Sequence, residues 1–134
     1  MDTKNTKVVG RHVLVMDDEA TIRHLLQDSL GYLGYEVTAT SNGEEAIAAY
    51  KSRRDNGGKF DAVIMDLTVR DGMGGSEAAM AIIQQYPDAV MIAASGDATD
   101  PVILQPEPYG FVECIVKPFN LGELAAKIRS LIGA

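Results

Sequence analysis

The sequence is short of cysteine, of long hydrophobic runs and of positive charge. Cys114 is the single cysteine among 134 residues, which excludes an internal disulfide and a small secreted scaffold held by disulfides. The longest apolar runs, residues 78–83 and 89–94, have six residues each, whereas a membrane-spanning helix needs about 20. Nineteen acidic residues stand against 12 Lys and Arg, a net charge of −7, which argues against binding to nucleic acid or to an anionic membrane surface. We therefore expect a cytoplasmic chain with no membrane insertion and no direct nucleic-acid partner.

Length and composition fit one globular domain. A domain commonly has about 100–200 residues, and a hydrophobic share of 46% is ordinary for a folded chain. The first seven residues contain no apolar stretch, which excludes a signal peptide there. We expect a polar N-terminal tail over residues 1–10 and a single domain over residues 11–134.

Short β-rich runs alternate along the chain with segments of helical spacing. All but one of these runs are continuously apolar, which is typical of strands buried on both faces of a sheet. Glu36 and Thr38 interrupt the second run, so it resembles an edge strand. The predicted strands cover residues 12–16, 35–40, 62–65, 90–94 and 111–116.

Helix starts are marked by capping residues. Ser41 with Glu44, and Asn120 with Glu123, have the spacing of a capping box, which predicts helices that begin at Ser41 and Asn120. Apolar residues recur at helical spacing over residues 22–33 and 121–132, and a further helix fits residues 76–85.

The region after the fourth strand is predicted to hold only a short or irregular helix. Asp100 and Pro101 form a good helix start, but Pro106 and Pro108 leave room for little more than a turn or two. Five strands that alternate with five helices predict an α/β fold, a (βα)₅ chain with a mostly parallel sheet covered on both faces.

Polar side chains follow four of the predicted strands. In an open parallel sheet, ligands bind beyond the carboxyl ends of the strands, so these side chains are expected on one rim. Carboxylates, a hydroxyl and an amine gathered there indicate a site for a hard divalent cation and a phosphoryl group. The residues are Asp17, Asp18 and Glu19 after the first strand, Asp66 after the third, Ser95 after the fourth and Lys117 after the fifth.

The carboxylates of this rim need a cation if all are to stay ionised. Asp17, Asp18 and Asp66 would repel one another within a few ångströms, and Mg²⁺ prefers such oxygen ligands together with phosphate oxygens. An aspartate beside the ion can act as a nucleophile toward phosphorus, and Lys117 and Ser95 can contact the incoming phosphoryl oxygens. The simpler alternative is that the first acids only cap the following helix.

Four sequence motifs lie at the predicted strand ends: VLVMDDE at residues 13–19, VIMDL at 63–67, IAASG at 92–96 and IVKPF at 115–119. Together they make the chain resemble the receiver domain of two-component response regulators. Each motif alone is weak, but all four occur in order and each lies at a strand end. The resemblance covers residues 11–132.

This resemblance implies a flavodoxin-like three-layer fold with strand order 2-1-3-4-5. It also implies Asp66 as the phosphoacceptor, with Mg²⁺ or Mn²⁺ as the cofactor. The implied metal ligands are Asp17, Asp18, Asp66 and the backbone carbonyl of Thr68. Lys117 is then the partner of the phosphoryl group, Ser95 is the switch hydroxyl, and the Lys117–Pro118 peptide bond is cis.

The same resemblance implies a signalling domain rather than a conventional enzyme. Its partner would be a histidine kinase or a histidine phosphotransfer protein, and both phosphotransfer and dephosphorylation would be catalysed by the domain itself, with Thr68 and Asp97 setting the phosphoryl lifetime. Residues 66–75 look most like receivers of hybrid sensor kinases, and a weak homodimer is left open. Two departures are Cys114, where many receivers carry an aromatic residue, and residues 69–70, where many carry a proline.

Three alternative functions use the same elements. A pseudo-receiver would bind partners without phosphorylation, although the set of polar rim residues is intact. A haloacid-dehalogenase-like phosphatase needs a second aspartate where Thr68 stands, and a flavodoxin-type FMN carrier would place its phosphate against the first acidic run. His12 and His24 are predicted as surface residues rather than phosphohistidines, and Cys114 as a small buried hydrophobic residue.

Overall fold

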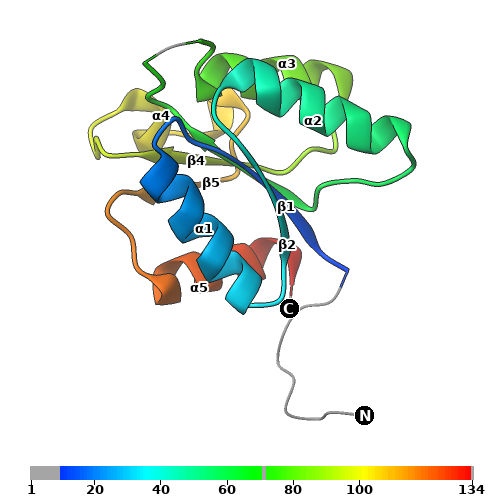
Figure 1. The fold of residues 1–134 in the computed structure, drawn as a ribbon. Helices are drawn as coiled ribbons and strands as arrows, with labels where there is room; N and C mark the ends of the chain where they lie inside the picture. Colours follow the sequence, from blue (N-terminus) through cyan, green and yellow to red (C-terminus); the bar gives the residue numbers. More distant parts are fainter. Residues whose placement is uncertain (1–9, 71, 134) are drawn as a thin grey trace.

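The computed structural model describes residues 10–70 and 72–133 and contains a single sheet flanked by helices (Figure 1). Apart from Gly10, the tail expected over residues 1–10 lies outside the described residues. The elements are β1 (His12–Met16), α1 (Ala20–Tyr32), β2 (Glu36–Thr40), α2 (Gly43–Asp55), β3 (Ala62–Asp66), α3 (Gly75–Gln85), β4 (Met91–Ser95), α4 (Pro101–Leu104), the 3₁₀ turn η1 (Glu107–Tyr109), β5 (Glu113–Val116) and α5 (Leu121–Ile132).

The sheet has the predicted topology. Its five strands are all parallel and run in the order β2-β1-β3-β4-β5. Helices α1 and α5 lie on one face of the sheet, and α2 and α3 lie on the other (Figure 1). The predicted three-layer, flavodoxin-like α/β fold is confirmed, including the edge position of β2.

Two hydrophobic cores fill the spaces between the sheet and the helices. Because side chains alternate along a strand, Val13 and Val15 of β1 pack toward α1 and α5, whereas Leu14 and Met16 pack toward α2 and α3. Strands β3 and β4 divide their apolar side chains in the same way. The continuous apolar runs of the sequence are therefore the signature of strands covered on both faces.

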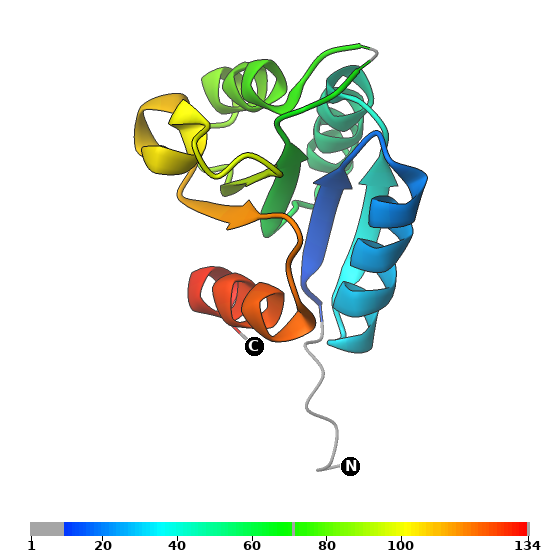
Figure 2. The same ribbon diagram turned by 90° about the vertical axis from the view of Figure 1, so that its left-hand side faces the viewer.

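The register of the sheet brings the carboxyl ends of its strands together. Met16 lies beside Met65, Asp66 beside Ala94, and Ser95 beside Val116. Figure 2 shows β1, β2 and β3 pointing toward the same end of the molecule. The residues that follow β1, β3, β4 and β5 therefore share one edge, which is the carboxyl edge of the sheet.

Helix α2 begins later than predicted. Its N-cap is Asn42, whose side chain accepts a hydrogen bond from Glu45 N at 2.9 Å, and Glu45 reaches back to the backbone N–H of Ser41 at 2.8 Å. The predicted start at Ser41 with Glu44 is wrong by one residue, since Asn42 is also a strong capping residue. Glu44 instead accepts a hydrogen bond from Met73 N.

Helix α5 has the predicted cap. Asn120 accepts a hydrogen bond from Glu123 N at 2.8 Å, so the helix begins where the sequence places it. The short helix α4 is likewise confirmed, with Asp100 as the N-cap and Pro101 at its first position.

Helix α3 begins directly against the end of β3. A side chain at Gly75 would collide with the carbonyl oxygen of Asp66, so this close approach requires glycine. The start of α3 therefore lies beside the residue predicted as the phosphoacceptor.

Strand β5 differs from its prediction. It is a second edge strand in which only Ile115 is buried, and Val116 is 36% exposed. The expectation that this strand is covered on both faces is wrong, because no further strand lies beyond it in the sheet. Among the described residues, the helices are too short or too polar to span a bilayer. The Lys117–Pro118 peptide bond is cis, as the resemblance implies.

Candidate functional site

Asp66, the last residue of β3, is buried at the carboxyl edge with 2% of its surface exposed. Its Oδ1 atom accepts a hydrogen bond from Thr68 N at 3.1 Å and lies 3.2 Å from Lys117 Nζ. Burial raises the pKa of the Asp66 carboxyl to about 6, against the lowering effects of the Thr68 N–H and the Lys117 charge. The ionised carboxylate is therefore poorly solvated and attracts a cation.

Lys117 bridges two buried acids. Its Nζ atom donates to Asp17 Oδ2 at 2.6 Å and lies 3.2 Å from Asp66 Oδ1. Burial by itself lowers the pKa of the Lys117 ammonium, but the hydrogen bond to Asp17 and the charges of Asp66 and Asp17 outweigh it, so the pKa is raised. Lys117 thus stays protonated and offsets the repulsion between the two carboxylates.

Three acids that follow β1 form an oxygen-rich cluster. One carboxylate oxygen each of Asp17, Asp18 and Glu19 lies within 4.8 Å of the other two. Asp17 is 1% exposed, its Oδ1 accepts from Glu19 N at 3.0 Å, and its carbonyl oxygen accepts from Arg23 Nη1 at 2.8 Å. Carboxylate oxygens held in this way are ligands suited to a hard divalent cation.

Ser95, at the end of β4, is buried at the same edge. Its hydroxyl oxygen accepts a hydrogen bond from Asp97 N at 3.0 Å, and its carbonyl accepts one from Lys117 N at 2.8 Å. Asp97 in turn accepts from the hydroxyl and the amide of Thr99, which lowers the pKa of the Asp97 carboxyl. The Ser95 hydroxyl is therefore engaged with its own loop in this structure.

A cleft of about 450 Å³ opens over this edge of the sheet. Four of the six predicted site residues line it, whereas Asp17 and Ser95 are buried and are not among its lining residues. The structure thus brings the predicted residues to one edge of the sheet. The lining residues are Asp18, Glu19, Ile22, Asp66, Thr68, Arg70, Gly96, Asp97, Lys117 and Pro118.

Glu19, which the sequence places on this rim without a role as a metal ligand, joins the oxygen cluster. Two contributors to the site were not predicted from the sequence. Arg23 holds the carbonyl of Asp17 from the first turns of α1. Arg70 donates its backbone N–H to Asp18 Oδ2 at 3.1 Å, which no residue pattern could reveal, because every residue except proline carries that N–H.

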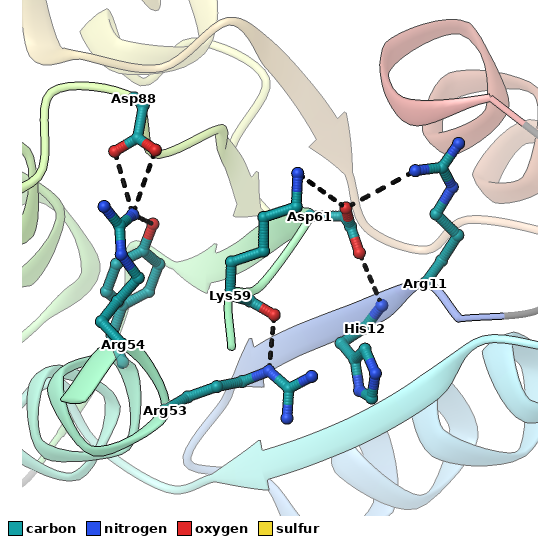
Figure 3. A network of polar contacts seen from close by, with 8 residues as sticks. Arg11, His12, Arg53, Arg54, Lys59, Asp61 and Asp88 are labelled. Carbon is teal, nitrogen blue, oxygen red and sulfur yellow. Dashed lines mark hydrogen bonds and ion pairs between the residues drawn. The ribbon is translucent and has the colours of Figure 1, made fainter. Parts of the chain in front are cut away.

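The amino edge of the sheet holds a second polar cluster (Figure 3). Asp61, just before β3, accepts a hydrogen bond from His12 N at 2.8 Å, and its other oxygen lies 3.8 Å from Arg11 Nη1 and 3.6 Å from Lys59 Nζ. Here one buried carboxylate faces two cations and a backbone amide. Its contacts are those of a structural ion pair.

The two histidines and the cysteine are not among the residues that line the cleft. His24 is exposed on α1, as predicted, whereas His12 is half-buried and its Nδ1 lies 2.9 Å from Glu36 Oε2. Cys114 is half-buried rather than buried, and its Sγ lies 3.6 Å from the carbonyl oxygen of Ile103.

Comparisons with known proteins agree with this geometry. Chemotaxis protein CheY from Thermotoga maritima is 34% identical over 113 residues, which cover 84% of this chain and 89% of that protein. The solved structure of response regulator protein TrrA from Thermotoga maritima, in complex with Mg²⁺ and BeF, has a TM-score of 0.76 and 34% identity and covers 90% of this chain and 98% of that one.

A probable transcriptional regulator, ycf27 from Porphyridium aerugineum, is 34% identical over 125 residues, or 90% of this chain and 47% of the relative. The chain therefore spans about half the length of such regulators. The model of the family described as response regulator receiver domain matches residues 13–129. Because this match covers most of the chain, the chain belongs to the response regulator receiver domain family.

Proposed function

We propose that Asp66 is the phosphoacceptor of this receiver domain and takes a phosphoryl group from a phosphohistidine. The observation that carries this proposal is the buried Asp66 carboxylate beside Lys117, in a cleft that Asp18 and Glu19 also line. Among the described residues, no hydrogen bond is made to Asp66 Oδ2, whereas Oδ1 has two partners. Oδ2 is therefore our candidate for the attacking oxygen.

The proposed step is a phosphoryl transfer from nitrogen to oxygen. The carboxylate oxygen of Asp66 forms a bond to phosphorus while the P–N bond breaks, and the electron pair of that bond stays on the imidazole nitrogen. The product is an aspartyl phosphate and a histidine. In the later hydrolysis, water attacks phosphorus and the Asp66 carboxylate is the leaving group, which releases inorganic phosphate.

The donor set fits Mg²⁺ or Mn²⁺. It consists of oxygens only, and the Asp17 and Asp18 oxygens lie within 4.8 Å of each other. We propose Asp17, Asp18, Asp66 and the carbonyl of Thr68 as the protein ligands, with Glu19 close by. Bound there, the ion would neutralise the carboxylates and the charge on the phosphoryl oxygens. The Mg²⁺ in the TrrA complex supports the choice of this ion.

Lys117 and Ser95 are the proposed partners of the bound phosphoryl group. Lys117 already lies 3.2 Å from Asp66 Oδ1, so its ammonium group is within reach of a phosphoryl oxygen on that carboxylate. Ser95 would exchange its hydrogen bond with Asp97 N for one donated to the phosphoryl group. That exchange would move the loop after β4 and change the surface offered to partners, and Thr68 and Asp97 would set the lifetime.

The partner we propose is a histidine kinase or a histidine phosphotransfer protein in the cytoplasm. The likeness of residues 66–75 to receivers of hybrid sensor kinases favours that context. We assign residues 11–134 to the receiver domain.

The test is the intact mass of the protein after incubation with acetyl phosphate and Mg²⁺. We expect the addition of one phosphoryl group, dependent on Mg²⁺, absent from Asp66→Ala and retained in the matched control Asp61→Ala. An addition that persists in Asp66→Ala would refute Asp66 as the acceptor, and no addition to the wild type would favour a pseudo-receiver. Turnover of a free phosphate ester would instead support the phosphatase alternative.

A further inference from the structure

A single hydrogen bond links the loop that follows Asp66 to the acidic cluster that follows β1. The backbone N–H of Arg70 donates to Asp18 Oδ2 at 3.1 Å, between residues 52 positions apart in the sequence. Arg70 and Asp18 line the cleft over Asp66, and both also line a neighbouring hollow of about 390 Å³ beside α2. The bond therefore lies at the edge of the proposed metal site.

The orientation of the Asp18 carboxylate depends on this one hydrogen bond, whereas the Asp17 carboxylate is held by more than one contact. Asp17 is buried, and its carboxylate is fixed by both Glu19 N and Lys117 Nζ. Asp18 is only half-buried, and within the described part of the chain the Arg70 N–H is the one hydrogen-bond donor to its carboxylate. Without that donor, Asp18 would be free to rotate among several side-chain conformations.

We infer that the Arg70 backbone N–H is a positioning donor that orients Asp18 as a metal ligand. The inference rests on the proposed Mg²⁺ site. A hydrogen bond to Oδ2 holds the carboxylate in one orientation and leaves Oδ1 available to a cation, so less side-chain entropy is lost on metal binding. Removing a group that orients a metal ligand typically costs about 10–100-fold in metal affinity.

The same bond gives the loop after Asp66 an anchor on the metal ligand. The far end of this loop is held at the start of α2, where Met73 N donates to Glu44 Oε1 at 2.9 Å and Gly43 N donates to Met73 O at 2.7 Å. Arg70 is exposed and lies between these anchors and Asp66. Loss of the Arg70 N–H would therefore loosen the middle of the loop and leave its ends attached.

The experiment compares Arg70→Pro with Arg70→Ala, in the full chain, by calorimetric titration with Mg²⁺ alone. Both variants lose the guanidinium group, but only the proline variant loses the N–H. We expect Arg70→Pro to bind Mg²⁺ about 10-fold more weakly than Arg70→Ala, with little difference in the melting temperature of the two metal-free proteins. Equal affinities of the two variants would overturn the inference.

A second measurement tests the same hydrogen bond without a proline substitution. In the ¹H–¹⁵N NMR spectrum of the metal-free protein, we expect Asp18→Ala to move the Arg70 amide proton upfield and to speed its exchange with solvent. Glu36→Ala, a change of an exposed acid on β2, serves as the control and should leave this signal in place. An Arg70 amide that does not respond to Asp18→Ala overturns the inference even if Mg²⁺ binds the wild type. A wild type that binds no Mg²⁺ contradicts the proposed metal site itself, and the inference with it.

Discussion

The two ends of strand β3 carry buried aspartates in opposite electrostatic settings. Asp61, at the amino end, has a side chain that is 6% exposed, and it faces His12 N, Arg11 and Lys59 (Figure 3). Asp66, at the carboxyl end, pairs with one cation among the described residues, Lys117, and shares it with the buried carboxylate of Asp17. Burial is similar at both ends, so what differs is the sign of the neighbouring charges.

This difference distinguishes Asp61, a structural acid, from Asp66, the proposed phosphoacceptor. At the amino edge the charges are paired, and Arg54 likewise donates to both carboxylate oxygens of Asp88, at 3.0 and 3.1 Å. At the carboxyl edge, Lys117 pairs with both Asp17 and Asp66, and Asp18 and Glu19 add two further acids beside Asp17. An excess of buried negative charge is unfavourable for an isolated fold and becomes favourable only when a cation is bound.

The largest expected effect is on phosphorylation. Asp66→Ala should abolish incorporation of the phosphoryl group from acetyl phosphate in the presence of Mg²⁺, because it removes the attacking oxygen, whereas Asp61→Ala should be phosphorylated at a rate close to that of the wild type. Phosphorylation rates of the two variants, followed by intact mass, test this difference. If both variants lost the reaction equally, the distinction between the two aspartates would fail.

Lys117→Ala should slow phosphorylation by about 10²-fold, since it removes an ammonium group that lies 3.2 Å from Asp66 Oδ1, within reach of the phosphoryl oxygens. The matched change at the amino edge, Lys59→Ala, should leave the rate unchanged. Time courses at saturating Mg²⁺ measure both rates. A Lys117→Ala rate within twofold of the wild type would contradict the role proposed for the ammonium.

How much of this could be predicted from the sequence depends on the kind of interaction. Buried apolar runs that end in polar residues predicted the strand ends. They also predicted that Asp17, Asp66 and Lys117 lie together, because a parallel sheet brings the carboxyl ends of its strands to one edge. The hydrogen-bond donor to each oxygen of the acidic cluster could not be predicted from the sequence. Arg23 and the Arg70 N–H reach the acidic cluster through local backbone geometry, which residue types alone do not encode.

The errors in the predicted start of α2 and in the predicted burial of β5 have similar causes. The start of α2 was misplaced because Ser41 and Asn42 are both good capping residues, and only the packed structure selects between them. Strand β5 was taken as buried on both faces because its apolar run does not reveal which strands lie at the edges.

Stability should respond with opposite signs at the two ends of β3 in metal-free buffer. The pKa of Asp66 is raised from 3.8 to about 6, so the native state holds its proton to higher pH than the unfolded chain, and stability falls as pH rises between about 4 and 6. Asp66→Asn removes this ionisation and should stabilise the protein by about 3 kcal/mol at pH 8, but not at pH 4.

Asp61→Asn should instead destabilise the protein by about 1 kcal/mol at pH 8, because it weakens a charge-assisted hydrogen bond and removes the charge that faces Arg11 and Lys59. Urea unfolding at the two pH values measures both variants. Destabilisation by Asp66→Asn at pH 8 would show that its neighbours stabilise the ionised carboxylate, and Asp66 would then not differ from Asp61 in this respect.

The smallest effect on stability should come from Lys59, an exposed cation of the polar cluster at the amino edge of the sheet. Lys59 is 67% exposed and lies 3.6 Å from Asp61 Oδ1, so Lys59→Ala should change the free energy of unfolding by less than about 0.5 kcal/mol. A loss comparable with that of Asp61→Asn would mean that this ion pair, rather than the amide of His12, holds Asp61.

The most direct test of the central claim is to locate the phosphoryl group on the chain. Borohydride reduces an aspartyl phosphate to the alcohol, so protein treated with acetyl phosphate and Mg²⁺ can be reduced, digested and sequenced by mass spectrometry. We predict conversion at Asp66, absent when Mg²⁺ is omitted, and none at Asp61. Conversion at Asp17 or Asp18 in place of Asp66, or at no aspartate in protein that has gained the mass, would contradict the assignment of Asp66 as the phosphoacceptor.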